Sequence, residues 1–182
     1  MKKSGCYAIL FGVESGVQKN LDMLKKNVTI DCIRGAVRMA KKAKIKVSTP
    51  FIFGIPGETF EEGLKTIDFA IELNADMVNF HTLTPYPGTE LYDHIEKYGK
   101  MTNKSEDLTF ETGAFTPFTM TRSEILHLKE LGFRRFYCRP SYMIKRILSV
   151  RSRYDFLALF YGAKAIWVLL KHPKLFQKKY VD

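Results

Sequence analysis

The sequence predicts an α/β fold in which parallel strands alternate with helices, and three observations support this class. Three apolar runs have the length and composition of strands, at Tyr7–Phe11, Ile45–Phe53 and Met77–Thr84. Amphipathic segments with helical spacing follow these runs. A turn that contains glycine or proline separates each run from the next helix. The strands should be parallel, because each helix carries the chain back to the start of the next strand.

The N-terminal part of the chain predicts one strand and two helices. Tyr7–Phe11 is short, apolar and closed by Gly12, which is the pattern of a buried strand. Helices are expected over Val17–Lys26 and Thr29–Lys44, with a break at Asn27. The second helix has apolar residues at helical spacing and lysines at its end, where cations favour the helix dipole. One face of this helix should therefore pack on the core.

The middle of the chain repeats the same pattern. Ile45–Phe53 predicts a second buried strand. Thr59, with Glu62 three positions later, is the signature of a capping box and predicts a helix through about Leu73. The apolar run Met77–Thr84 then predicts the third strand, so a second strand-helix-strand unit follows the first.

The next segment predicts two helices and a connection between them. A short helix through about Tyr98 is expected after the third strand. Residues 99–120 are polar and rich in turn-forming residues, so they are expected to form an extended cover segment without regular structure. Thr121 and Glu124 mark the start of another helix, and Arg139-Pro140 marks its end.

The cysteines favour neither a disulfide framework nor a metal site. Cys6, Cys32 and Cys138 are odd in number, and their spacing does not fit a two-pair zinc site. A reducing cytoplasm is the natural interpretation. The apolar run near the N-terminus is too short for a secretion signal, because Gly12 and Glu14 interrupt it. We therefore predict a cytoplasmic chain and no metal ligand among its residues.

Unusual residues follow each predicted strand, where ligands bind in parallel α/β folds. The three segments are Gly12–Gly16, Gly54–Thr59 and Thr84–Thr89. A carboxylate between small residues, such as Glu14, can accept hydrogen bonds from an ammonium group or from ribose hydroxyls. The glycines of the second segment open the backbone to a flat ring. The sequence thus predicts a binding site that these three segments share.

Together, these motifs resemble the radical S-adenosylmethionine (radical-SAM) superfamily. The resemblance is carried by Gly5–Gly16, Phe51–Thr59, Asp68–Ala70 and Thr84–Tyr92, and Phe136–Pro140 resembles a segment that follows the barrel. The most similar branch is the one associated with cobalamin domains, which includes anaerobic magnesium-protoporphyrin ester cyclase and several methyltransferases. The resemblance implies a partial TIM-type barrel of α/β class, of which this chain supplies the C-terminal units, followed by a basic α-helical extension. The expected domains are residues 1–98 for the barrel, 99–121 for the cover segment and 122–182 for the extension.

The resemblance also implies a cofactor and a set of contacts. Members bind S-adenosylmethionine next to a four-iron four-sulfur cluster, and some also use cobalamin. Glu14 and Ser15 are expected at the methionyl or ribose part, the backbone of the second segment at adenine, and the third segment on the substrate side. The residues expected to contact the cofactor are Glu14, Ser15, Gly54, Ile55, Pro56, Gly57, Thr84, Pro85 and Tyr86.

One departure from the family pattern limits the expected activity. The CxxxCxxC motif that holds the cluster in this family occurs nowhere in the sequence. We therefore expect the cluster to come from a missing N-terminal half of the barrel, or from a complementing chain, and we expect this chain alone to be inactive. The intact enzyme would generate a 5′-deoxyadenosyl radical or transfer a methyl group. The alternative function is a non-catalytic remnant that uses its basic helices at a membrane surface or in protein interaction.

The positive charge of the chain is concentrated in the extension. Residues 1–121 carry 15 Lys/Arg and 15 Asp/Glu, whereas residues 122–182 carry 14 Lys/Arg and 4 Asp/Glu. Phe156–Leu170 is apolar but shorter than the roughly 20 residues of a membrane-spanning helix. Three interpretations stay open: packing on the missing half of the barrel, a peripheral membrane helix with Tyr161 and Trp167 at the interface, and a nucleic-acid patch.

Overall fold

The computed structural model describes residues 1–101, 114–150, 153, 156–157, 159–162 and 164. The chain forms two compact units, Met1–Lys129 and Glu130–Asp182, and each is described by itself. The boundary between them lies inside a helix. The division into a barrel, a cover segment and an extension stays a prediction.

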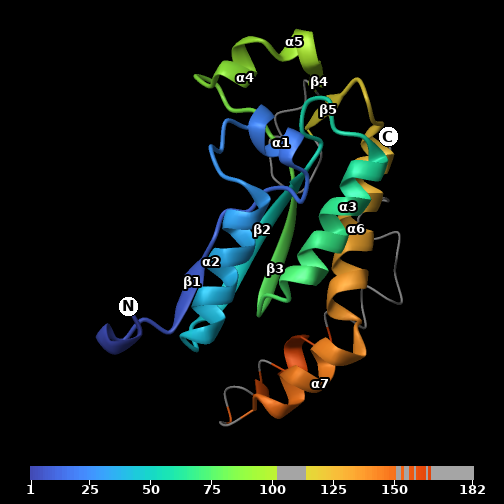
Figure 1. The fold of residues 1–182 in the computed structure, drawn as a ribbon. Coiled ribbons are helices and arrows are strands. Elements are labelled where there is room, and N and C mark those ends of the chain that lie inside the picture. Colours follow the sequence, from blue (N-terminus) through green and yellow to red (C-terminus); the bar gives the residue numbers. More distant parts are fainter. Residues whose placement is uncertain (102–113, 151–152, 154–155, 158, 163, 165–182) are drawn as a thin grey trace. The chain divides into compact units, whose positions relative to one another are not determined.

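The first unit is built on a parallel sheet, as the sequence predicts. Its three strands lie in the order β1-β2-β3, and both pairs are parallel. Figure 1 shows α2 and α3 on the same side of this sheet, and α1 close to the carboxyl ends of the strands. The elements in chain order are a 3-10 turn at Lys2–Ser4, then β1 (Ala8–Leu10), α1 (Gln18–Met23), α2 (Ile30–Lys42), β2 (Lys46–Phe53), α3 (Phe60–Leu73) and β3 (Met77–Thr82).

The core of this unit lies between the sheet and its two long helices. Along β2, side chains alternate between buried and more accessible positions, and the buried set includes Phe51 and Phe53. The ring of Phe80 in β3 stacks on both, at 5.7 Å and 5.6 Å between centroids. Helices α2 and α3 contribute buried aliphatic side chains, such as Val37 and Ile67, to the same layer. The central strand is therefore held mainly by apolar packing on its helix-covered face.

The first strand forms where it is predicted, but the prediction that it is buried is wrong. Tyr7 is 74% exposed and Leu10 is 63% exposed, and the burial pattern of β1 shows no buried residue. The physical reason is its position, because β1 lies at an edge of the sheet and pairs only with β2 in the described part of the chain. An apolar run alone does not distinguish an edge strand from a central one.

The helix starts agree closely with the sequence signals. Thr59 accepts a hydrogen bond from the amide of Glu62, and the Glu62 side chain accepts one from the amide of Thr59 at 3.0 Å. Thr121 and Glu124 form the same reciprocal pair before α6. The capping box predicted at Thr59 is therefore confirmed, and the helix start predicted at Thr121 is confirmed with the same hydrogen bonds.

The segment after β3 is more regular than predicted. The single expected helix is two short ones, α4 (Glu90–Asp93) and α5 (Ile95–Tyr98). The expectation of no regular structure over residues 99–120 is wrong at both ends, because β4 (Gly99–Met101) pairs antiparallel with β5 (Phe115–Pro117). Each of these strands is only three residues long, and their pairing joins positions that are distant in the sequence. No local sequence pattern therefore predicts them.

The second unit contains the end of α6 (Arg122–Tyr137) and α7 (Pro140–Leu148). An aromatic cluster holds them together, since the rings of Phe136 and Tyr137 lie 5.4 Å and 5.1 Å from that of Tyr142. Among the described residues, no helix is long and apolar enough to cross a bilayer. Trp167 and most of the apolar stretch 156–170 lie outside the described residues.

Candidate cofactor-binding site

The three predicted segments meet at one edge of the sheet. Each follows the carboxyl end of a parallel strand, and these ends lie together at one end of the first unit (Figure 1). Glu14 extends the pairing of β1 by a bridge to Phe51, and the amide of Leu83 donates to the carbonyl of Phe53 at 2.8 Å. The shared edge that the sequence predicts is therefore present.

The first segment places a carboxylate in a constrained position. Glu14 has a backbone φ of 66°, in the left-handed region that non-glycine residues rarely adopt. Its backbone is held there because its amide donates to Pro50 and its carbonyl accepts from Ile52. A side chain at Gly12 would come within 2.7 Å of the Glu14 carboxylate. Such strain, fixed by the neighbouring strand, is often found at functional sites.

The Glu14 carboxylate already binds a cation. The ammonium group of Lys26 lies 3.0 Å from its Oε1, and the Glu14 side chain is 16% exposed. This pair shows that the position accepts an amino group. With its charge compensated by Lys26, the carboxylate is also suited to accept hydrogen bonds from neutral hydroxyls.

The second segment, after β2, exposes its backbone at Gly57 only, because Gly54 is buried against Ile125. Gly54 and Gly57 have φ angles of 86° and 77°, which favour glycine. Ile55 and Pro56 are buried, whereas Gly57 is exposed and has open space where a Cβ would stand. A flat ligand can therefore approach the backbone at Gly57 closely.

A buried carboxylate fixes this turn. Oε2 of Glu58 accepts hydrogen bonds from the amides of Gly54 at 2.8 Å and Ile55 at 3.2 Å. Its backbone carbonyl accepts one from the hydroxyl of Thr119. Glu58 is fully buried. The side chain thus satisfies two donors that the turn would otherwise leave without partners in the protein interior.

The same carboxylate connects the first segment to the second. Nδ2 of Asn20 donates to Oε1 of Glu58 at 3.2 Å and to the hydroxyl of Ser15 at 3.2 Å. The Ser15 hydroxyl lies 3.1 Å from that of Thr66, which also accepts from the amide of Gly16. Ser15, Asn20 and Thr66 are all fully buried. Two strand-end loops are therefore joined by a continuous buried network.

Burial changes the acid strength of Glu58. Removal from water raises its pKa to about 7, although the backbone amides of Gly54 and Ile55 act in the opposite direction. Glu58 and Asn20 were not predicted from the sequence as residues of the site. A carboxylate four positions after the first glycine of a tight turn is a signal that could have found Glu58, since an acidic side chain can return to the backbone of its own turn.

The third segment lies beside the other two but is more exposed. Thr84 and Pro85 are buried, whereas Tyr86 is 41% exposed. Thr89 begins α4, and its hydroxyl donates to the carbonyl of Tyr86 at 2.7 Å. An ion pair at 2.6 Å joins Lys25, two residues after α1, to Glu90, the first residue of α4. All nine predicted contact residues thus lie in loops at one edge, while their contacts with a cofactor stay a prediction.

The cysteines do not form a cluster site. Cys32 is exposed, Cys6 and Cys138 are half-buried, and all three are free. The described residues contain no group of three or more His, Cys, Asp or Glu side chains that could hold a metal ion. Within the part of the chain that the structure describes, the strand-end loops are thus suited to an organic cofactor, and the three cysteines do not come together as ligands for an iron-sulfur cluster.

The fold is an α/β partial barrel, and the strand-end loops form a candidate binding site at its carboxyl edge. The sequence profile of the Radical SAM superfamily matches residues 1–70, and the chain belongs to this superfamily. S-adenosylmethionine and a four-iron four-sulfur cluster are the cofactors that this superfamily implies. The predicted resemblance is confirmed, including the branch that contains the magnesium-protoporphyrin ester cyclases and methyltransferases.

Two curated relatives show how much of such a protein this chain represents. It is 34% identical over 148 residues to an uncharacterized methyltransferase of Pyrococcus horikoshii, covering 81% of this chain and 32% of the relative. It is 29% identical over 142 residues to the anaerobic magnesium-protoporphyrin IX monomethyl ester cyclase of Rubrivivax gelatinosus, covering 78% of this chain and 25% of that enzyme. The chain therefore spans about a third or less of these relatives.

A solved structure supports the fold. Elp3 of Methanocaldococcus infernus, with its N-terminus deleted, superposes with a TM-score of 0.52 at 21% sequence identity. The match covers 70% of this chain and 28% of that protein. Together with the parallel sheet, this similarity confirms the predicted α/β class of partial TIM type.

Proposed function

We propose that this chain forms the S-adenosylmethionine-binding part of a radical-SAM enzyme. The observation that carries the proposal is the buried network of Ser15, Asn20 and Glu58, which holds two strand-end loops in a fixed relation. A site that binds a cofactor across two loops needs such pre-organisation, because ordering the loops at the moment of binding costs free energy. The third loop, Thr84–Tyr86, completes the edge on the substrate side.

Each loop has a distinct role in this proposal. The Glu14 carboxylate accepts hydrogen bonds from the ribose hydroxyls or from the methionyl ammonium group. The ion pair with Lys26 favours the hydroxyls, because a second cation would have to share or replace the first. The backbone of Gly54–Gly57 lies against adenine. Ser15 acts through its buried hydroxyl by positioning the loop that carries Glu14.

The iron-sulfur cluster comes from outside this set of residues. We propose that an N-terminal barrel segment, on the same polypeptide or on a complementing chain, supplies the three thiolates. Bound beside a reduced cluster, S-adenosylmethionine would supply either a methyl group or, after one electron from the cluster breaks its sulfur–C5′ bond and releases methionine, a 5′-deoxyadenosyl radical. The residues of the three strand-end loops bind and orient the cofactor, and they neither hold the cluster nor reduce it. Whether cobalamin takes part depends on the rest of the protein.

A binding titration tests the proposal on the full chain. We expect equilibrium dialysis with labelled S-adenosylmethionine to show saturable binding, and Glu14→Ala to weaken it by about tenfold, the loss of one charge-assisted contact. Glu72→Ala is the matched control, because it also removes a carboxylate from an ion pair, the one with Arg34, but lies away from the strand ends. Equal affinity of the Glu14→Ala variant and the unaltered chain would overturn the assignment of this residue.

A further inference from the structure

Helix α7 presents its apolar side to solvent. Four large apolar side chains of this helix are exposed: Met143 by 43%, Ile144 by 57%, Ile147 by 56% and Leu148 by 77%. At 100° per residue, these four side chains fall within one face of the helix. The opposite face carries Tyr142, which is 9% exposed. This arrangement is the reverse of an ordinary surface helix, whose apolar face is buried.

The aromatic cluster fixes this orientation. The Tyr142 ring lies 5.1 Å from the ring of Tyr137 and 5.4 Å from that of Phe136, and the Arg139 guanidinium lies 4.3 Å above Phe136. These contacts anchor the inner face of α7 to the end of α6. The apolar face therefore cannot turn inward without breaking the cluster.

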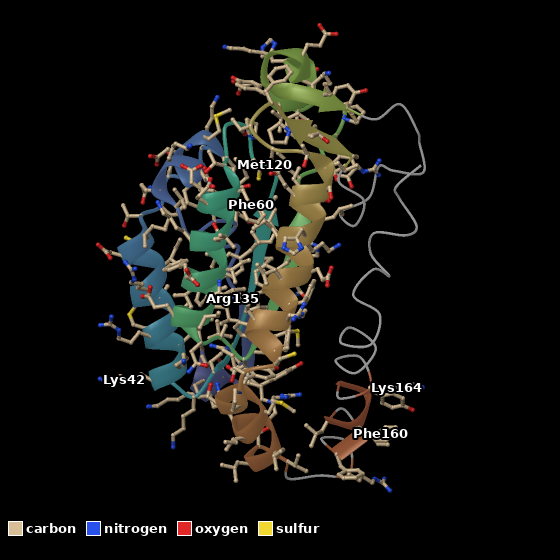
Figure 2. The ribbon with its side chains drawn as sticks, turned by 90° about the vertical axis from the view of Figure 1, so that its right-hand side faces the viewer. Lys42, Phe60, Met120, Arg135, Phe160 and Lys164 are labelled. Carbon is tan, nitrogen blue, oxygen red and sulfur yellow. The ribbon has the colours of Figure 1, made fainter. Side chains whose placement is uncertain are left out.

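A second apolar surface follows along the chain. Phe156, Leu157, Phe160 and Tyr161 belong to a helical stretch and are 61%, 49%, 59% and 64% exposed. Leu157, Phe160 and Tyr161 follow Phe156 by one, four and five positions, a spacing that places all four side chains on one side of a helix. Figure 2 labels Phe160 and Lys164, which come from this same stretch. Two neighbouring segments of this unit thus share the same character, with large apolar side chains in solvent and basic residues beside them.

Positive charge accompanies both surfaces. Between Glu130 and Asp155 the sequence has seven Lys/Arg residues and no acidic residue. Lys145 and Arg146 lie in the last turn of α7 and are half-buried beside its apolar face. Exposed apolar side chains with basic residues at their margin are the pattern of a helix that lies in the headgroup region of a bilayer.

We propose that α7 and the described helical residues that follow it, 156–157, 159–162 and 164, bind the surface of an anionic lipid bilayer. Charge complementarity selects this partner over a second copy of the chain, because two such basic surfaces would repel each other. The apolar face enters the boundary between headgroups and acyl chains, while Lys145, Arg146 and Arg153 meet the lipid phosphates. A barrel bound in this way acts at a membrane surface, so its substrate would be apolar or itself membrane-associated. This last step rests on the proposed function, whereas the lipid contact does not.

Co-sedimentation of the full chain with vesicles tests the proposal. The vesicles are phosphatidylcholine alone, or phosphatidylcholine with about a quarter phosphatidylserine. We expect binding to the anionic vesicles only, and release when the salt concentration rises from about 0.1 M to about 0.5 M. Ile147→Ser combined with Leu148→Ser should weaken binding by about tenfold or more, because two apolar side chains no longer leave water. Lys145→Gln should weaken it about fivefold, the contribution of one basic residue near such a surface.

Two exposed residues of α2 provide matched controls. Met39→Ser removes an apolar side chain that is 69% exposed, and Lys42→Gln removes a lysine from the last turn of that helix. Neither control should change vesicle binding. Absence of binding to anionic vesicles, or equal losses in the controls and the α7 variants, would overturn the proposal. A salt-insensitive dimer in sedimentation velocity that Ile147→Ser dissociates would also overturn it, since a second copy would then cover the face.

Discussion

The side-chain amide of Asn20 donates to the carboxylate of Glu58 across 3.2 Å, and this bond joins the helix after the first loop to the turn after the second. The other amide atom of Asn20, its Oδ1, is buried and has no hydrogen-bond partner among the described residues. Rotation of the Asn20 side-chain amide by a half-turn would therefore present the acceptor Oδ1 to Glu58 in place of the donor Nδ2. Asn20 can therefore donate a hydrogen bond to the ionised Glu58 carboxylate or accept one from the protonated carboxyl group. The two loops stay joined in both protonation states.

Removal of the Glu58 carboxylate should destabilise the chain. Glu58→Ala leaves the amides of Gly54 and Ile55 buried without their acceptor, and it opens a cavity. We expect the free energy of unfolding to fall by about 3 kcal/mol. Urea denaturation followed by circular dichroism measures the change. Glu61→Ala, an exposed neighbour in the same first turn of α3, should cost less than about 1 kcal/mol. Equal losses in the two variants would contradict the role given to Glu58.

The raised pKa of Glu58 predicts a dependence of stability on pH. Its pKa is about 7 in the folded chain and close to 4.5 when unfolded, so the folded state binds more protons between these values. The contribution of this group is fully present below about pH 4.5 and is lost as the pH rises through 7. We expect the free energy of unfolding to fall over this range by up to about 1.4 kcal/mol per pH unit from this group.

Glu58→Gln isolates that contribution. The amide has the same shape and cannot ionise, and the Asn20 side chain can turn to match it. Unfolding midpoints measured from pH 4.5 to 8 should therefore change less steeply with pH in this variant than in the unaltered chain. If the two curves run parallel throughout, Glu58 does not titrate in this range.

Replacement of Gly16 and of Gly35 by alanine should change the stability of the chain in opposite directions. A Cβ at Gly16 would stand 2.5 Å from the Cβ of Phe69 and 3.0 Å from the backbone of Thr66, so Gly16→Ala must displace α3. We expect it to lower the free energy of unfolding by about 1–3 kcal/mol. Gly35 lies inside α2 with open space around it, and Gly35→Ala should raise stability by about 0.5–1 kcal/mol. Thermal unfolding of both variants checks the pair, and a stable Gly16→Ala variant would show that the loop has room to move.

The chain alone should not assemble the cluster of its superfamily. Anaerobic reconstitution with iron and sulfide, followed by desalting, should leave far fewer than four iron atoms per chain, because the three cysteines lie far apart in sequence and form no ligand group. Iron analysis and the visible absorption spectrum check this result. A stoichiometric four-iron cluster that is lost in a Cys6→Ser variant would contradict it.

The sequence predicted the sheet, its helices and the loops that form the candidate site. These features depend on short-range signals, namely apolar runs, capping boxes and glycines after strands, that each element carries in its own residues. Thr59 with Glu62, and Gly54 with Gly57, are examples that the structure reproduces.

What the sequence did not predict depends on contacts between distant residues. The exposure of β1 follows from its place at the sheet edge, which its own residues do not encode. The pairing of β4 with β5 joins Gly99 to Pro117. The bond from Asn20 to Glu58 spans 38 positions, so the residue that holds the second loop was not apparent from either segment alone.

The most direct test of the account follows the backbone amides of the full chain by NMR during a titration with S-adenosylhomocysteine, a non-reactive analogue of S-adenosylmethionine. We predict that the largest shift changes fall at the amides of Glu14, Gly54, Ile55, Gly57, Thr84 and Tyr86, with smaller changes in α2 and α7. Saturable changes confined to other parts of the chain, or none at all, would contradict a cofactor site at the carboxyl edge of the sheet.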